Sequence, residues 1–282
     1  MNLTPSDALS GVVRTTVDTA HGKVQFRSAG MAPKVTHVLL HGIGSASASW
    51  AFQLGAAVGR SDIRVLAWDA PGYGRSTHLP MDCPSAQDYA ERVWSWLDAL
   101  YVNQSVVLAG HSLGALMAAS ATRLRPQAVS RLVLLAPARG YGDAPLVERE
   151  RVVQGRLSNL QQLGPDGMAK ARAAAMLSPG AAPALQEAVR ETMAQIDPAG
   201  YAQAVQMLGL ACLAQDLKSL GRPVLVASGE ADTVTPPANC DAVAQDAAAK
   251  RISLGPVGHA CPLEAAEVVN ALLGLPILGG LE

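Results

Sequence analysis

Six short apolar runs recur along the chain, and each ends in small or polar residues that are typical of a turn. Their continuous apolar character indicates strands buried on both faces, as in a parallel sheet, because half-exposed strands alternate apolar and polar residues. The runs are Val35–Leu40, Ile63–Trp68, Ser105–Ala109, Arg131–Ala136, Pro223–Ser228 and Arg251–Leu254. Before them, β-branched and alternating residues at Val12–Val17 and Lys23–Arg27 predict two further strands.

Helical patterns lie between these strands. Ser85 and Asp88 fit a capped helix start, and the nearly all-apolar segment after Ser112 is expected to be buried on most sides. The predicted helices are Ser85–Leu100, Leu113–Leu124, Ala238–Ala249 and Pro262–Leu273. Strands that alternate with helices predict an α/β fold, with a mostly parallel eight-stranded sheet flanked by helices.

Residues 139–200 interrupt the alternation of strands and helices. This segment is rich in Ala, Gln and Met, and prolines divide it at positions 145, 165, 179, 183 and 198. We interpret it as a helical cap inserted into a core formed by residues 1–138 and 201–282. The apolar tail Leu275–Leu281 is a candidate for docking on the core or on a second subunit.

Composition and charge exclude several classes of protein. Of the 282 residues, 49% are hydrophobic and 16% charged, which excludes long disorder. The formal net charge is −1, so nothing steers the chain to nucleic acid or to an acidic membrane. The uncharged stretch Ser105–Ala121 is short for a membrane span and has glycine, histidine and serine at its centre. We therefore expect neither nucleic acid nor membrane as a partner.

The cysteines favour a reducing compartment. Cys83, Cys212, Cys240 and Cys261 are scattered without a C-x-x-C pair, so neither a disulfide framework nor a metal site is expected. The N-terminal residues lack the apolar core of a signal peptide. These features together predict a cytoplasmic protein.

The sequence Gly110-His111-Ser112-Leu113-Gly114 joins a predicted strand to a predicted helix. In a G-x-S-x-G motif the serine sits on a tight turn with its Oγ exposed, and the flanking glycines avoid clashes there. The backbone N–H of the next residue points at a developing oxyanion. Ser112 is therefore the candidate nucleophile and Leu113 a candidate oxyanion-hole donor. The strand before and the helix after it disfavour the alternative of a merely close-packed turn.

A serine hydroxyl needs a base, and in this arrangement the acid and then the base follow the serine along the chain. Of the six histidines, only His259 lies late enough, directly after the last predicted strand. Asp232 follows the preceding strand and is the candidate that orients His259, with Glu230 as its rival. Cys261 is interpreted as a small buried hydrophobic residue.

The segment His41-Gly42-Ile43-Gly44 ends an earlier strand, and its glycines allow close approach of a substrate carbonyl. The N–H of Ile43 is the second candidate oxyanion-hole donor, with Gly44 as the alternative. His41 is interpreted as structural, its ring holding the loop by hydrogen bonds. In the following turn, Asp69 and Arg75 are candidates for an ion pair that fixes the loop.

Taken together, these segments resemble the alpha/beta-hydrolase superfamily. The resemblance covers Val35 to Leu273 apart from the insertion, and it rests on HGIG (41–44), DAPGYGRS (69–76), GHSLG (110–114), GEADTVTP (229–236) and GHACPLE (258–264). It is closest to members with a helical cap, which implies that residues 139–200 form a lid over Ser112. By the same resemblance, Ser112, Asp232 and His259 form the triad, and Ile43 and Leu113 form the oxyanion hole.

The resemblance also narrows the reaction. Haloalkane dehalogenases and epoxide hydrolases use an aspartate nucleophile, where this chain has Ser112. Carbon–carbon bond hydrolases of aromatic degradation typically have Asn before the serine and Trp after the histidine, where this chain has His111 and Ala260. Carboxylesterases and enol-lactone hydrolases remain compatible with the sequence. We therefore predict a serine hydrolase of a small-molecule ester or lactone, without organic cofactor or metal, acting as a monomer or homodimer.

Two alternatives stay open. Carbon–carbon hydrolysis would need a basic lid residue to bind a substrate carboxylate, and the candidates are Arg139, Arg156, Lys170, Arg172 and Arg190. A receptor-like ligand-binding protein would keep the triad but barely turn over, as in the strigolactone and karrikin receptors of plants, which share this fold. The lid methionines are candidates either for lining an acyl pocket or for simple helix packing; they are Met168, Met176 and Met193.

Overall fold

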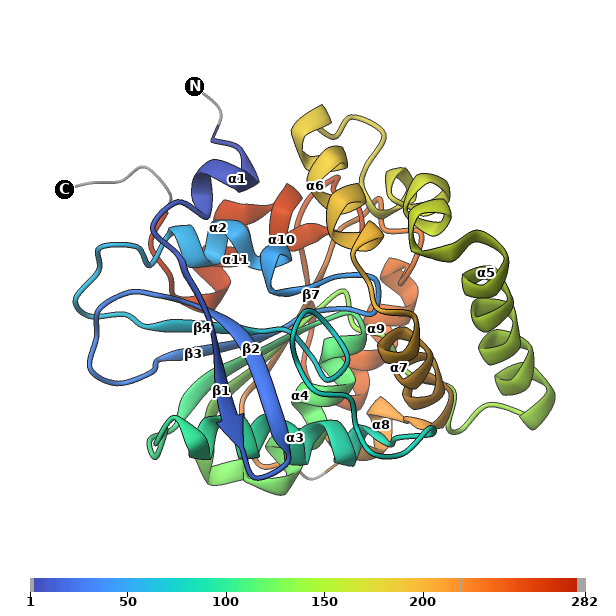
Figure 1. Cartoon of the computed structure of the whole chain (residues 1–282), viewed down its shortest axis with the longest axis horizontal. Coiled ribbons are helices and arrows are strands. Elements are labelled where there is room, and N and C mark those ends of the chain that lie inside the picture. Colours follow the sequence, from blue (N-terminus) through green and yellow to red (C-terminus); the bar gives the residue numbers. More distant parts are fainter. Residues whose placement is uncertain (1–2, 219, 278–282) are drawn as a thin grey trace.

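An eight-stranded sheet forms the centre of the molecule in the computed structural model, which describes residues 3–218 and 220–277 (Figure 1). The strands are β1 (Val13–Thr19), β2 (Gly22–Ala29), β3 (His37–Leu40), β4 (Val65–Trp68), β5 (Val106–His111), β6 (Val129–Leu135), β7 (Val224–Ser228) and β8 (Arg251–Ser253). Their order is β1-β2-β4-β3-β5-β6-β7-β8. The pairs β1/β2 and β2/β4 are antiparallel and the others parallel. The predicted fold class is confirmed.

Helices cover both faces of the central strands, which explains why β3 and β4 are buried at every position, whereas the outer strand β1 is largely exposed. Along β4, Leu66 and Trp68 join the core cluster under α3 and α4, whereas Val65 and Ala67 join the cluster on the opposite face. In Figure 1, α3, α4, α8 and α9 lie below the sheet, and α2, α10 and α11 lie above it. The bounds are α2 (Ala51–Gly55), α3 (Ala86–Ala99), α4 (Leu113–Leu124), α8 (Leu213–Leu217), α9 (Pro237–Asp246), α10 (Cys261–Glu264) and α11 (Ala266–Leu273).

The segment between β6 and β7 is helical and lies beyond one end of the sheet (Figure 1). It contains α5 (Leu146–Arg172), the 3-10 turn Ala174–Met176, α6 (Pro183–Ala194) and α7 (Pro198–Leu210). Helix α5 bends where Gly164, at φ 60°, precedes Pro165. The predicted cap boundary at residue 200 falls inside α7, because Asp197 begins this helix by accepting a hydrogen bond from the N–H of Gly200.

Some short elements differ from the sequence predictions. The predicted helix Pro262–Leu273 is two helices, because Ala265 leaves helical geometry with ψ at 40°. Helix α1 (Pro5–Ala8) and the 3-10 turn Ser47–Trp50 before α2 were not predicted, since a single turn carries too few residues to show a period. Of the apolar tail, Leu275 is buried, and residues 278–282 lie outside the described part.

Within the described residues, every helix is too short or too polar to cross a membrane.

Candidate active site

Ser112 occupies a sharp turn between β5 and α4. Its backbone has φ 54° and ψ −117°, a conformation that residues other than glycine rarely adopt and that matches the tight turn expected of a G-x-S-x-G motif. The turn is possible only with glycine at both flanking positions. A Cβ on Gly110 would lie 2.3 Å from the carbonyl oxygen of Gly114, and one on Gly114 would lie 2.3 Å from that of Leu40. The elbow thus holds Ser112 at the carboxyl edge of the sheet.

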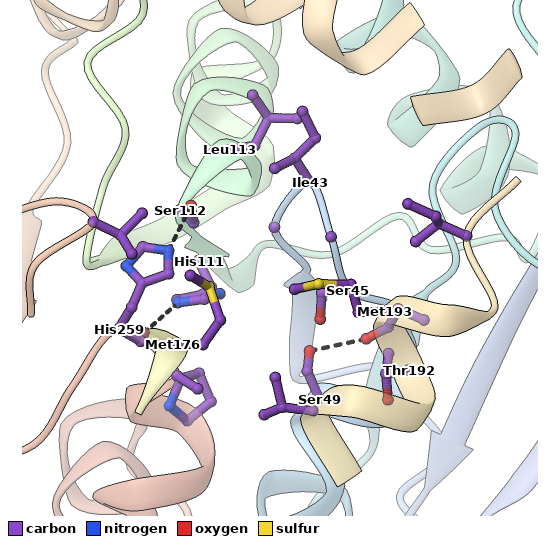
Figure 2. Close-up of a pocket in the computed structure, with 18 of the residues that line it drawn as sticks. Ile43, Ser45, Ser49, His111, Ser112, Leu113, Met176, Thr192, Met193 and His259 are labelled. Carbon is purple, nitrogen blue, oxygen red and sulfur yellow. Dashed lines mark hydrogen bonds between the residues drawn. The ribbon is translucent and has the colours of Figure 1, made fainter. Parts of the chain in front are cut away.

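The loops after β7 and β8 bring two further side chains to Ser112. The Oγ of Ser112 lies 2.9 Å from Nε2 of His259 and donates a hydrogen bond to it. On the other side of the ring, Nδ1 of His259 donates to Oδ2 of Asp232 at 2.9 Å. All three side chains are buried. The structure therefore joins the three predicted catalytic residues in one hydrogen-bonded chain (Figure 2 shows Ser112 and His259).

The carboxylate of Asp232 is held in its charged form by several donors. Its Oδ1 accepts the backbone N–H groups of Val234 and Thr235 at 2.8 and 2.9 Å. The hydroxyl of Thr235 lies 2.8 Å from Oδ2 and 3.0 Å from the carbonyl oxygen of Ala136. Burial opposes the charge, but the hydrogen bonds from His259 and Thr235 outweigh it and lower the pKa of Asp232. The rival Glu230 is exposed and pairs with Arg251 at 2.9 Å.

The loop after β3 runs beside Ser112. The hydroxyl of Tyr73 donates to the carbonyl oxygen of Ile43 at 2.5 Å. His41 accepts the N–H of Ala70 at Nε2, 3.0 Å away, and its Nδ1 lies 2.8 Å from the carbonyl oxygen of Gly42. Because Nε2 accepts an N–H, the ring fits the neutral tautomer with its proton on Nδ1, and burial lowers the pKa of His41. The structural role predicted for His41 is confirmed.

A cavity of about 900 Å³ opens over Ser112. Both predicted oxyanion-hole residues, Ile43 and Leu113, line it together with His259. Residues of the predicted cap supply much of the opposite wall. All three lid methionines line the cavity there: Met168, Met176 and Met193. Figure 2 shows Met176 beside His259 and Met193 beside Ser45. The pocket thus lies between the loops at the carboxyl edge of the sheet and the helical segment that follows β6.

The cap is tied to the loop that carries His259. The carboxylate of Glu264 accepts the N–H of Gly258 at 2.8 Å and that of Ser178 in the cap at 3.0 Å. The N–H of Ala260 donates to the carbonyl oxygen of Met176 at 2.7 Å. Movement of the linker after α5 would therefore disturb the backbone of the histidine loop.

Comparison with known proteins agrees with this geometry. Residues 38–272 match the family described as "Alpha/beta hydrolase family". The chain belongs to this family.

Two curated relatives match parts of this alpha/beta hydrolase. The pig (Sus scrofa) protein named 1-acylglycerol-3-phosphate O-acyltransferase ABHD5 is 33% identical over 124 residues, which are 43% of this chain and 34% of the relative. The dihydrolipoyllysine-residue acetyltransferase component of an acetoin cleaving system from Pseudomonas putida is 30% identical over 244 residues, 83% of this chain and 60% of the relative. The chain spans about a third of the length of the first curated relatives that it matches.

Solved structures agree on the fold. An esterase from Thermogutta terrifontis aligns with a TM-score of 0.80 at 21% identity, covering 93% of this chain and 97% of the other. The enol-lactonase from Burkholderia xenovorans aligns with a TM-score of 0.80 at 21% identity, covering 92% and 98%. Identities at this level establish the architecture of the alpha/beta hydrolase but not its substrate.

Three residues of the site lie within the sequence motifs, but the sequence did not predict a role for them. They are His111, Thr235 and Glu264. The Nε2–H of His111 donates to the backbone carbonyl oxygen of His259 at 2.8 Å, and the two rings lie 4.9 Å apart. The only sequence signal for these three residues was their place inside GHSLG, GEADTVTP and GHACPLE. Their hydrogen-bond partners could not be predicted, because these partners are remote in sequence.

The predicted ion pair between Asp69 and Arg75 is wrong. Asp69 instead lies 3.7 Å from Arg14 and accepts the N–H of Ser47.

The prediction that Cys261 is a small buried hydrophobic residue is confirmed. Cys261 is fully buried, and burial raises the pKa of its thiol well above the ordinary value. It is therefore a packing residue and not a competing nucleophile.

We expect His111 to make the alpha/beta hydrolase sensitive to acid. Burial and the adjacent His259 lower the pKa of His111 to about 3. In the unfolded chain a histidine has a pKa of about 6.5, so the unfolded state binds more protons below that pH and stability falls as pH falls. The His111 contribution to this loss is about 2 kcal/mol at pH 5.

Urea unfolding of wild type and His111→Asn at pH 7 and pH 5 measures this contribution. The variant should lose about 2 kcal/mol less than wild type between the two pH values. Equal losses in both proteins would contradict the assignment.

Proposed function

We propose that this protein is a serine hydrolase that cleaves a carboxylic ester or lactone of a small molecule through an acyl-enzyme on Ser112. The observation that carries the proposal is the unbroken chain of hydrogen bonds, 2.9 Å from Ser112 to His259 and 2.9 Å from His259 to Asp232, at the floor of a large cavity. Families with this fold host many reactions, so the reaction is argued from the site.

The geometry suits acyl transfer. Ser112 attacks the substrate carbonyl while Nε2 of His259 takes the hydroxyl proton, and Asp232 stabilises the resulting imidazolium. The N–H groups of Leu113 and Ile43 would stabilise the negative oxygen of the tetrahedral intermediate. His259 then protonates the leaving alcohol, and a water molecule activated by the same ring releases the acid.

The charges of the lid favour ester or lactone cleavage over carbon–carbon hydrolysis of an acidic substrate. Three of the candidate lid cations line the cavity, but so do four lid carboxylates, and the lid wall has no excess of positive charge. These residues are Arg139, Arg156 and Arg172 against Asp143, Glu148, Glu187 and Glu191. Arg190 pairs with Glu187, and Lys170 is exposed.

Hydrolysis of p-nitrophenyl butyrate by wild type and by Ser112→Ala tests the proposal. Wild type should turn over many times, and the variant should fall to the uncatalysed rate. A fluorophosphonate probe should add one label to wild type and none to the variant, as measured by mass spectrometry. Turnover by Ser112→Ala equal to wild type would contradict the proposal. A single stoichiometric burst would instead support the receptor-like alternative.

A further inference from the structure

The N-terminal hairpin forms one wall of the cavity, and two arginines lie on that wall. Arg14 of β1 and Arg27 of β2 are opposite each other in the antiparallel ladder, so their side chains project from the same face. Both line the cavity that contains Ser112. Thr4 and Ser6 of the preceding segment line it as well. We call these four residues the N-terminal wall.

The two guanidinium groups are incompletely neutralised. Nη2 of Arg14 donates to Oε1 of Gln25 at 2.8 Å and lies 3.7 Å from Oδ2 of Asp69. Nε of Arg27 is buried and has no hydrogen-bond partner among the described residues. Burial and the neighbouring Arg14 lower the pKa of Arg27, and Asp69 opposes that effect. The carboxylate of Asp69 therefore faces the two positive charges of Arg14 and Arg27. On the lid side of the cavity, by contrast, the arginines do not outnumber the carboxylates.

We propose that Arg14 and Arg27 form a subsite that binds a carboxylate of the substrate. The inference rests on the proposed function and specifies its substrate class: an ester with an acid group remote from the scissile carbonyl. A guanidinium presents paired N–H groups that match a carboxylate, and two such groups from opposed residues line the cavity side by side. Asp69 accepts the N–H of Ser47 at 2.8 Å through Oδ1, and its Oδ2, which has no hydrogen-bond partner among the described residues, lies 3.7 Å from Nη2 of Arg14.

The sheet order indicates how far the acid group lies from the nucleophile. Strands β2 and β5 are separated by β4 and β3, and the register places Arg27 level with Ala109, three residues before Ser112. The backbone of Arg27 is therefore about 14 Å from that of Ser112 across the sheet and about 10 Å along it. The arginine side chain bridges part of that distance. The intervening wall is polar, with the cavity-lining serines 45, 47 and 49. An ester of a medium-length dicarboxylic acid, such as suberate, fits this span better than one of succinate.

The test compares p-nitrophenyl monosuberate with its uncharged isostere, the p-nitrophenyl ester of suberamic acid. A second pair carries the acid on the leaving group: the butyryl ester of 8-hydroxyoctanoate and its amide. In wild type, kcat/KM for the acid should exceed that for the amide by about 10-fold in at least one pair, the size expected of one charge-assisted hydrogen bond. The ratio should fall with added salt.

The variants locate the effect. Arg27→Gln should reduce the acid-to-amide ratio about 10-fold, and the half-exposed Arg14→Gln should reduce it by less. Arg75→Gln is the matched control, because it removes the same charge from an exposed residue of the adjacent loop and should keep the ratio. Arg14→Gln replaces a residue whose side chain is 44% exposed, so it tests the subsite even where Arg27→Gln does not fold.

A wild-type ratio near one in both pairs would overturn the inference. So would a ratio that the Arg14 and Arg27 variants leave unchanged, because the acid would then bind elsewhere. Either result, obtained with normal turnover of the neutral ester, leaves the proposed function standing. Loss of the proposed function would instead appear as turnover that survives in Ser112→Ala.

Discussion

Replacing His259 by alanine is expected to lower kcat/KM for p-nitrophenyl butyrate by about 10⁴-fold to 10⁶-fold. In the structure, Nε2 of His259 lies 2.9 Å from Oγ of Ser112, and within residues 3–218 and 220–277 no other imidazole bonds to that hydroxyl. Of the other pocket imidazoles, His111 bonds to a backbone carbonyl group and His41 bonds to backbone groups. Neither can take over, because an alcohol without an adjacent base is a weak nucleophile.

Initial-rate kinetics on purified His259→Ala measures this loss. His21→Ala is the matched control, since His21 is exposed in the turn between β1 and β2 and should retain full activity. Thermal unfolding of both proteins verifies that they fold. A folded His259→Ala protein with more than a tenth of wild-type activity would contradict the assignment of the base.

Replacing Gly114 by alanine is expected to destabilise the fold by about 3 kcal/mol or more. The new Cβ would lie 2.3 Å from the carbonyl oxygen of Leu40 and 2.7 Å from that of His41. Both oxygens belong to backbone at the end of β3, so a rotamer change cannot relieve the overlap. Helix α4 would have to move away from the sheet, which would also displace Ser112.

Urea unfolding at equilibrium measures this effect. Gly155→Ala provides the control, because Gly155 lies within helix α5 and a Cβ there meets no atom within 4 Å. That change should stabilise the protein by about 0.5–1 kcal/mol, the difference in helix propensity. Equal stability of Gly114→Ala and wild type would contradict the close approach of α4 to β3.

Local patterns in the sequence were sufficient to predict the architecture. All eight predicted strands correspond to observed strands, because the central strands, covered on both faces, are mostly apolar and β1 and β2 carry the β-branched, alternating pattern of a strand. The predicted helices after Ser85 and at Leu113–Leu124 are also present, and Ser85 and Asp88 form the expected capping box. Elements of one turn escaped prediction, since hydrophobic periodicity needs several turns to be visible.

The candidate triad could be predicted for a different reason. In a parallel sheet all carboxyl ends lie at one edge, so residues that directly follow strands gather there whatever their distance in sequence. Ser112, Asp232 and His259 each follow a strand closely, and strand order β5-β6-β7-β8 places them within reach of one another. Their catalytic roles remain predictions that the kinetics above test.

The sequence by itself determined the fold class, the elbow at Ser112 and the order of the candidate acid and base, because these depend on local pattern and on sheet topology. Only the tertiary structure decided that Arg14, and not Arg75, lies beside Asp69. It also decided that His111 supports the backbone of His259. Such contacts join side chains from separate elements, and their distances depend on how helices and loops pack and not on any repeating pattern along the chain.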